Sequence, residues 1–267
     1  EDIEEKMDGL LIHSENFQAL NLLQESYREQ VRCIYIDPPF NANSSEILYK
    51  NSFKHSSWIS LMQNRIKMSD TFWMPNTVLI VAIDEIEQEN LGLLLNSLYP
   101  SHERTNITVV SNPSGQQGDS FSNTHEYACF VYADRKAIGK EHRDDLDADV
   151  RPLRDVSGND NKRTDAANCF YPIYVMDNTI IGFGDVCPDE FHPSGANVKR
   201  DDGIIEVYPI DIQGIEKKWV FARQTVDTIL DELKVEYNRN REIFDIIRTK
   251  RIFNFKTVWT DKKYSAN

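Results

Sequence analysis

The sequence has few of the patterns that bind metal. None of its four cysteines lies in a C-x-x-C pair, and its six histidines show no spacing of the H-E-x-x-H kind. Structural zinc sites use closely spaced Cys and His ligands, so we expect no metal. Four scattered cysteines in 267 residues are typical of a reducing compartment, and we therefore expect a cytoplasmic protein.

Long apolar runs are missing as well. No run approaches the roughly 18 residues that a membrane-spanning helix needs, so we expect no membrane partner. The first six residues are mostly charged and have no apolar core of a signal peptide. They also lack an initiator Met, which favours a chain that begins inside a longer protein.

Positive charge is scarce, and the net charge is −13. This argues against non-specific wrapping of nucleic acid, which depends on neutralising phosphates. It does not exclude a protein whose basic residues gather on one face. Two interpretations of a basic cluster near the end stay open: a nucleic-acid-binding face and a solvated helix face. The cluster comprises Arg239, Arg241, Arg248, Lys250, Arg251, Lys256, Lys262 and Lys263.

The apolar residues, 40% of the chain, indicate a globular protein. An apolar run over Val31–Ile36 ends at Asp37-Pro38-Pro39 and indicates a strand, and the near-continuous apolar run Thr77–Ile83 is typical of a strand buried on both faces. Apolar spacing predicts helices over 17–27, 58–66 and 86–98, and strands over 107–110 and 127–132. The order predicts an α/β fold with a doubly wound, Rossmann-like sheet and one antiparallel edge.

Two further features follow from local composition. Residues 41–55 are polar and predict a loop, after which Ser56 or Ser57 starts a helix. After about residue 135 the chain becomes highly charged. Short β-like runs then appear at 171–176, 179–183 and 204–208, before a helical stretch at 224–234. We expect an inserted mixed α+β module whose loops are a recognition surface or a peripheral decoration, and the role of loops in specificity favours the first.

The segment Asp37-Pro38-Pro39-Phe40 is the candidate reaction centre. Two prolines stop a strand, so the aspartate lies at a carboxyl strand end, where ligands bind in α/β sheets. Its carboxylate and the Pro38 carbonyl can accept hydrogen bonds from both N–H groups of an exocyclic base amine. The nitrogen lone pair is then directed at a methyl donor. Phe40 offers a face on which an extruded base can stack.

Two alternatives bear on this segment. The plain structural one is a rigid turn after a strand. A different chemistry, C5-cytosine methylation, needs a Cys nucleophile that follows a Pro. No Cys here follows a Pro, and Cys187 precedes one, so that chemistry is disfavoured.

Several segments carry a family resemblance. They are, in chain order, residues 10–16, 34–41, 55–58, 82–85, 124–127, 169–173 and 258–266. Together they resemble the methylation (Mod) subunits of type III restriction-modification systems. The resemblance implies a β-class enzyme that transfers a methyl group from S-adenosylmethionine to N6 of adenine in double-stranded DNA. Asp37 is similar to the first motif residue of adenine enzymes, whereas many cytosine-N4 enzymes carry Ser there.

The resemblance also implies roles for single residues. The Asp37-Pro38-Pro39-Phe40 segment is catalytic, and Asp37 together with Glu15 and Asn16 contacts the cofactor. Alternatively, Asn16 caps the helix that Phe17 begins. Phe40 and Asn41 bind the substrate base, although Asn41 equally fits support of the loop or a plain turn.

On the same resemblance the chain divides into three parts. Residues 1–135 are the catalytic half of a methyltransferase domain, residues 136–250 are the target-recognition region, and residues 251–267 are a connector. Trp58 either flanks the pocket or belongs to the core. The implied partners besides DNA are a second Mod subunit, forming a homodimer, and a restriction (Res) subunit.

One departure from the family matters. Its glycine-rich cofactor motif, Phe-x-Gly-x-Gly, does not occur in the 267 residues. Gly182 and Gly184 lack the right context, and we interpret them as a turn. We therefore expect a truncated fragment that binds S-adenosylmethionine weakly or not at all, and micromolar binding by calorimetry would refute this.

The leading hypothesis is an adenine-N6 DNA methyltransferase. The second is a DNA-recognition fragment without catalysis, which binds DNA but transfers no methyl group. A cytosine-N4 or RNA amino-methyltransferase is the third, and comparing duplex DNA with structured RNA as ligands separates it from the first.

Overall fold

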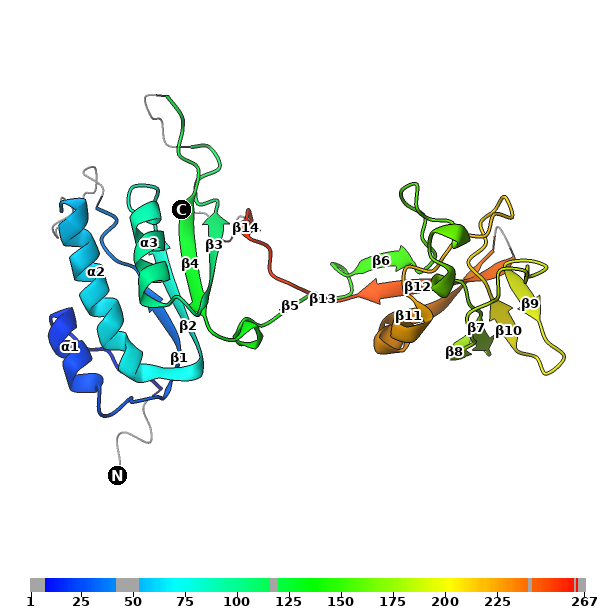
Figure 1. The fold of residues 1–267 in the computed structure, drawn as a ribbon, viewed down its shortest axis with the longest axis horizontal. Coiled ribbons are helices and arrows are strands. Elements are labelled where there is room, and N and C mark those ends of the chain that lie inside the picture. Colours follow the sequence, from blue (N-terminus) through cyan, green and yellow to red (C-terminus); the bar gives the residue numbers. More distant parts are fainter. Residues whose placement is uncertain (1–7, 42–52, 116–119, 240–241, 262, 264–267) are drawn as a thin grey trace. The chain divides into compact units, whose positions relative to one another are not determined.

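The computed structural model describes residues 8–41, 53–115, 120–239, 242–261 and 263 (Figure 1). The chain forms two compact units: unit 1 is Glu1–Lys140 with Asn254–Asn267, and unit 2 is Glu141–Phe253. Most of the loop predicted over 41–55 lies outside the described residues, as do Arg241 and Lys262 of the basic cluster. Among the described helices, none has the length and apolarity needed to cross a bilayer.

Unit 1 is built on a five-stranded mixed sheet, as the predicted α/β class requires. Its strands are β1 (Val31–Ile36), β2 (Trp73–Ile83), β3 (Glu103–Val109), β4 (Glu126–Tyr132) and β14 (Val258–Trp259), in the order β1-β2-β4-β3-β14. β1 is parallel to β2, and β14 is parallel to β3. The antiparallel strand was predicted at an edge, and this is wrong. β4 returns between β2 and β3 and pairs with both.

Helices cover one face of this sheet. They are α1 (Asn16–Leu23), α2 (His55–Ser69) and α3 (Gln88–Leu98). α2 places Trp58, Met62 and Ile66 on one stripe, because a step of four residues keeps side chains on the same side of a helix. This stripe and the buried face of α3 pack on alternate residues of β2 and β4, such as Leu79 and Val131. α2 and α3 accordingly lie against the sheet (Figure 1).

The predicted helix starts need one correction. α2 begins at His55 with Lys54 in the capping position, so the predicted start at Ser56 or Ser57 is one to two residues late. Helix ends are the least determined part of a periodic pattern. A short 3-10 helix, Asp70–Phe72, leads from α2 into β2.

The opposite face of the sheet carries the other alternate residues. Ile80 and Phe130 border a hollow of about 830 Å³, which Trp259 also lines. The edge of Phe130 meets Trp259 with ring centroids 6.2 Å apart. β2 is therefore apolar on both sides, as the unbroken apolar run predicted.

Unit 2 consists mainly of short antiparallel strands. They are β5 (Glu141–His142), β6 (Asp149–Pro152), β7 (Ile173–Met176), β8 (Thr179–Phe183), β9 (Asn197–Lys199), β10 (Ile205–Val207), β11 (Leu233–Asn238), β12 (Ile243–Lys250) and β13 (Ile252–Phe253). Three sheets result: β8-β7-β10-β9, β11-β12-β6 and β13-β5. Helix α4 (Arg223–Val226) continues as a 3-10 helix over Asp227–Glu232. Shorter 3-10 turns are Arg135–Ala137 in unit 1, and Arg163–Asp165 and Ala167–Cys169 in unit 2.

Unit 2 has its own core. Leu153, Tyr171, Trp219 and Ile246 are almost fully buried in one cluster. The Trp219 indole N–H donates to the Tyr171 carbonyl at 2.8 Å, which satisfies its polar group inside the apolar cluster. The target-recognition role predicted for residues 136–250 stays a prediction.

Three predictions in unit 2 are wrong. Gly182 lies in β8 instead of a turn, and Gly184 follows it where a Cβ would meet Pro172 and Tyr174 at 2.5 Å. The helix predicted over 224–234 ends early, since β11 begins at Leu233. The basic cluster is not a helix face, because much of it lies on or beside the β11–β12 hairpin.

Candidate active site

The predicted reaction centre lies where β1 ends. Asp37 follows the last residue of β1, whose Ile36 pairs with Val81 in the parallel strand β2. Asp37 is exposed, whereas Pro38 beside it is buried. A carboxylate hidden beneath the sheet would have excluded contact with a base, and this one is open to solvent. The sequence thus places the accessible Asp37 carboxylate directly before the rigid Pro38-Pro39 dipeptide, at the carboxyl edge of the sheet.

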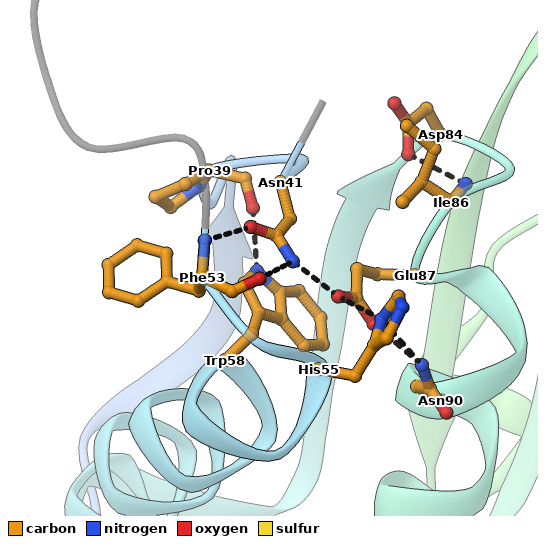
Figure 2. Close-up of polar contacts among 9 residues, drawn as sticks. All are labelled: Pro39, Asn41, Phe53, His55, Trp58, Asp84, Ile86, Glu87 and Asn90. Atoms are coloured by element: carbon orange, nitrogen blue, oxygen red, sulfur yellow. Dashed lines mark hydrogen bonds and ion pairs between the residues drawn. The ribbon is translucent and has the colours of Figure 1, made fainter. Parts of the chain in front are cut away.

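The loop is first held at Pro39. The indole N–H of Trp58 donates to the Pro39 carbonyl at 2.7 Å (Figure 2). Trp58 is 0% exposed and belongs to the core of unit 1. Of the two interpretations of Trp58, the core residue is therefore the correct one. Trp58 is a core residue whose indole N–H also anchors the segment Asp37–Asn41, which we call the reactive loop because it holds the predicted reaction centre.

The second anchor is the Asn41 side chain. Asn41 Oδ1 accepts from the Phe53 backbone N–H at 2.6 Å, and Asn41 Nδ2 donates to the Phe53 carbonyl at 3.0 Å. Nδ2 also donates to Glu87 Oε1 at 2.6 Å (Figure 2). Asn41 is buried and has a left-handed backbone with φ of 65°, a conformation that Asn tolerates better than most residues. These bonds support the loop, and the substrate contact predicted for Asn41 stays a prediction.

Glu87 is the acidic centre of this network. It is 0% exposed and precedes α3 as its capping residue. His55 Nδ1 lies 2.8 Å from Glu87 Oε1, and Asn90 Nδ2 donates to Oε2 at 2.7 Å (Figure 2). A buried carboxylate is tolerated when such partners satisfy it.

The adjoining end of β2 is also acidic. The pKa of Asp84 is raised to about 6, first by burial and then by the negative charges of Glu85 and Glu126, while the backbone N–H groups of Ile86 and Glu87 oppose the shift. The Ile86 N–H donates to Asp84 Oδ1 at 3.0 Å (Figure 2). Burial and then the Asp37 charge raise the pKa of Tyr35. The edge around Asp37 therefore carries negative charge that would favour an electropositive ligand group.

The remaining predicted site residues differ in exposure. Phe40 is half-buried and packs against the core of unit 1, so part of its ring is committed to the protein. Its role in stacking a base stays a prediction.

Glu15 caps α1. Its Oε2 accepts from the backbone N–H groups of Phe17 and Gln18, and its Oε1 pairs with Arg65 at 3.0 Å. The alternative in which Asn16 caps the helix is wrong, because Asn16 is already its first residue. The cofactor contacts predicted for Glu15 and Asn16 stay predictions.

S-adenosylmethionine does not fit the described residues as a complete site. Both carboxylate oxygens of Glu15 already have partners. Gly182 lies in β8 and Gly184 directly follows it, packed against Pro172 and Tyr174, so this G-x-G pair offers no turn that cradles a nucleoside. Among the described residues we therefore identify no glycine-rich cradle for the methyl donor. In that same part of the chain, no group of three or more His, Cys, Asp or Glu side chains could hold a metal.

Sequence reasoning assigned no individual role to Glu87, His55, Asn90 or Asp84, although His55 and Asp84 lie in segments that carry the resemblance. One signal was available: an acidic run directly follows the buried strand β2, at the same carboxyl edge as Asp37. Parallel neighbouring strands bring such ends together. The His55 and Asn90 contacts depend on helix packing and left no local trace.

Comparisons with known proteins bear on the family of the chain. A family model described as DNA methylase matches residues 31–267. A probable type III restriction-modification enzyme HindVI Mod subunit of Haemophilus influenzae is 30% identical over 125 residues, which are 45% of this chain and 17% of that protein. The type III EcoPI Mod subunit of Escherichia phage P1 is 22% identical, with 97% of this chain and 46% of that protein covered.

Similarity is not confined to type III systems. The type II methyltransferase M.KpnI of Klebsiella pneumoniae is 23% identical, with 94% of this chain and 61% of that protein covered. The chain thus spans less than two thirds of the length of these relatives. Among solved structures, an M1.HpyAVI–SAM complex is similar over 53% of this chain and 62% of its own, with 17% identity and a TM-score of 0.33.

Proposed function

Because the chain belongs to the N6/N4 DNA methylase family, we propose that it provides the amine-activating part of a DNA adenine-N6 methyltransferase. The observation that carries the proposal is the exposed Asp37 at the carboxyl edge of β1, on a loop anchored at Pro39 and Asn41. S-adenosylmethionine is the proposed methyl donor, in keeping with the family and with the predicted roles of Glu15, Asn16 and Asp37.

The proposed chemistry concerns the amine. The nitrogen lone pair of an exocyclic base amine is delocalised into the ring, which makes it a poor nucleophile. The Asp37 carboxylate and the Pro38 carbonyl accept hydrogen bonds from its two N–H groups and favour a tetrahedral nitrogen. Two consecutive prolines and the Trp58 bond to Pro39 hold these acceptors in place before the base arrives, so that little reorganisation accompanies transfer.

The substrate we propose is an adenine swung out of double-stranded DNA, with Phe40 stacking on the base and Asn41 holding the loop. Unit 2 is the proposed target-recognition region. The Mod relatives support a type III modification subunit that pairs with a second copy and with a Res subunit, while the type II relative supports a stand-alone enzyme.

The acceptor role is tested by methyl transfer with the full-length gene product on duplex DNA. We expect Asp37→Asn to lower kcat by roughly a hundredfold, the typical effect of removing one preorganised polar group. Asp134→Asn is the matched control, because Asp134 is exposed and its cap bond to Lys136 N–H can be kept by Asn. Equal activity of the Asp37 variant and wild type would remove Asp37 from the mechanism.

The base is identified by digesting the methylated DNA and separating its nucleosides by mass spectrometry. N6-methyladenine is expected, and N4-methylcytosine would move the enzyme to the cytosine branch of the family.

A second candidate function is DNA recognition without catalysis. The specific observation in its favour is that the described residues form no cradle for the methyl donor. DNA binding by the 267 residues with no methyl transfer by the full-length product would establish it.

A further inference from the structure

We propose that Glu87 is a positioning residue for the reactive loop, acting through Asn41. This inference rests on the proposed function, since it assigns Glu87 to the same loop. Glu87 does not belong to the loop. It lies between the end of β2 and the start of α3, 46 residues after Asn41 in the sequence. Its carboxylate is completely buried, so it acts by orienting neighbours and not by touching a substrate.

The first step of the argument is the orientation of the Asn41 amide. An Asn side chain can present its oxygen and nitrogen in two ways, and the partners decide between them. Phe53 offers one donor and one acceptor, at 2.6 and 3.0 Å. The Glu87 carboxylate, at 2.6 Å from Asn41 Nδ2, can only accept. It therefore selects the orientation in which the Asn41 oxygen receives the Phe53 N–H.

The second step is the short path from Asn41 to Asp37. Three residues separate them, and two of these are prolines with fixed φ. The indole N–H of Trp58 donates to the Pro39 carbonyl and fixes that residue. With Asn41 held as well, the segment has two anchors within three residues, which leaves Asp37 little freedom. Releasing Asn41 would remove one of these two hydrogen-bonded anchors.

The third step is the position of Glu87 among the elements. Its Oε1 lies 2.8 Å from His55 Nδ1 at the start of α2, and its Oε2 accepts from Asn90 in α3 (Figure 2). Glu87 thus connects the reactive loop to the first turns of α2 and α3. Purely structural packing at a buried position is met by an apolar side chain, whereas the Asn41 and Asn90 amide nitrogens donate and require an acceptor.

The experiment compares Glu87→Ala with Glu87→Gln in the full-length protein. Gln keeps an oxygen toward Asn41, so kcat should stay within about threefold of wild type, whereas Ala should lower kcat by roughly tenfold or more with KM for DNA little changed. Leu95→Ala is the matched control for stability, because Leu95 lies on α3, the helix that Glu87 caps, and its truncation opens a cavity in the core of unit 1. A kcat loss in Glu87→Ala no larger than in Leu95→Ala would overturn the inference.

A reciprocal exchange sharpens the test. Asn41→Asp places two carboxylates against each other and should lower kcat as Glu87→Ala does. Adding Glu87→Gln supplies a side-chain N–H to the new aspartate and should restore part of the activity. Activity in the double variant no higher than in Asn41→Asp would contradict an orienting contact between the two positions.

Hydrogen exchange separates this inference from the proposed function. The Phe53 backbone N–H donates to Asn41 Oδ1, so its exchange rate reports the orientation of that side chain without any methyl transfer. We expect faster exchange at Phe53 in Glu87→Ala and near-wild-type exchange in Glu87→Gln and Leu95→Ala. If wild type is inactive on DNA but this pattern holds, the function fails and the positioning role stands. Unchanged exchange in Glu87→Ala refutes the role whatever the activity.

Discussion

The pKa of the Asp84 side chain depends on its surroundings in the folded protein. Its folded pKa of about 6 lies above the ordinary value near 4, because the partly buried carboxyl resists ionisation beside Glu85 and Glu126. The folded state therefore keeps the proton to a higher pH than the unfolded chain does. The contribution of Asp84 to the free energy of unfolding is therefore fully present below about pH 4. It falls between about pH 4 and 6 and is lost above that range.

Replacing this carboxyl should remove that pH dependence. Asp84→Asn keeps an oxygen that accepts from the Ile86 N–H but cannot ionise. We expect its free energy of unfolding to equal that of wild type near pH 4 and to exceed it by about 1 kcal/mol at pH 7, after allowance for solvent screening. Urea unfolding at several pH values measures the gap. A gap of constant size across pH 4–7 would contradict the assigned ionisation.

The site residues were predictable to different degrees. Asp37 to Phe40 could be found because a strand, two prolines and a carboxylate are consecutive in the chain. Glu87 could not be found, because its proposed role depends on a contact with Asn41. That contact forms only when β1 and β2 pair. Glu15 was assigned to the cofactor on the resemblance alone, and that contact stays a prediction. Its capping of α1 was not predicted, because Glu is not among the favoured capping residues.

At the level of elements, α2 links the core to the reactive loop through Trp58. Trp58→Phe removes the indole N–H and leaves the Pro39 carbonyl without that donor. We expect a loss of about 1–3 kcal/mol in stability and a fall in kcat of roughly tenfold, because the loop is less well placed. Thermal melts and single-turnover assays measure the two effects.

Trp73→Phe is the control for this change. It also loses an indole bond, to Ser69 Oγ at 3.3 Å, but Trp73 stacks on Tyr99 instead of contacting the loop. Stability should fall and kcat should stay within about twofold of wild type. If both tryptophan variants lose activity in proportion to stability, the loop anchor has no separate role.

The elements of unit 1 were predictable because periodicity dominates there. Val31–Ile36 is a strand as predicted, and α2, α3 and β4 lie where apolar spacing placed them. The β11–β12 hairpin was missed although Leu233, Val235 and Tyr237 alternate with polar residues, a strand pattern. The preceding helical stretch and the basic charge obscured it. The position of β4 inside the sheet is a matter of pairing, which no local pattern contains.

For the whole molecule, separate cores predict separate responses to damage. Ile246→Ala opens a cavity in the core of unit 2, and Leu79→Ala does so in unit 1. Each should cost its own unit about 2–5 kcal/mol. Hydrogen exchange should accelerate across 141–253 in the first variant and across β2 and β4 in the second. Equal acceleration in both units by either variant would show a single cooperative structure.

We expect the 267 residues to bind S-adenosylmethionine weakly or not at all, because the described residues offer no glycine-rich cradle. Isothermal calorimetry measures this directly, and a dissociation constant in the micromolar range would contradict it.

The ends of unit 2 lie side by side. Glu141 pairs with Phe253, and His142 pairs with Ile252, in the two-stranded ribbon of β5 and β13. The chain thus departs from unit 1 after Lys140 and comes back at Asn254 through neighbouring strands. An insert of other length and sequence can be grafted between these points if its own ends are equally close. Under the recognition role that we propose for unit 2, exchange of this insert would change the recognised site and leave Asp37 and its supports unaltered.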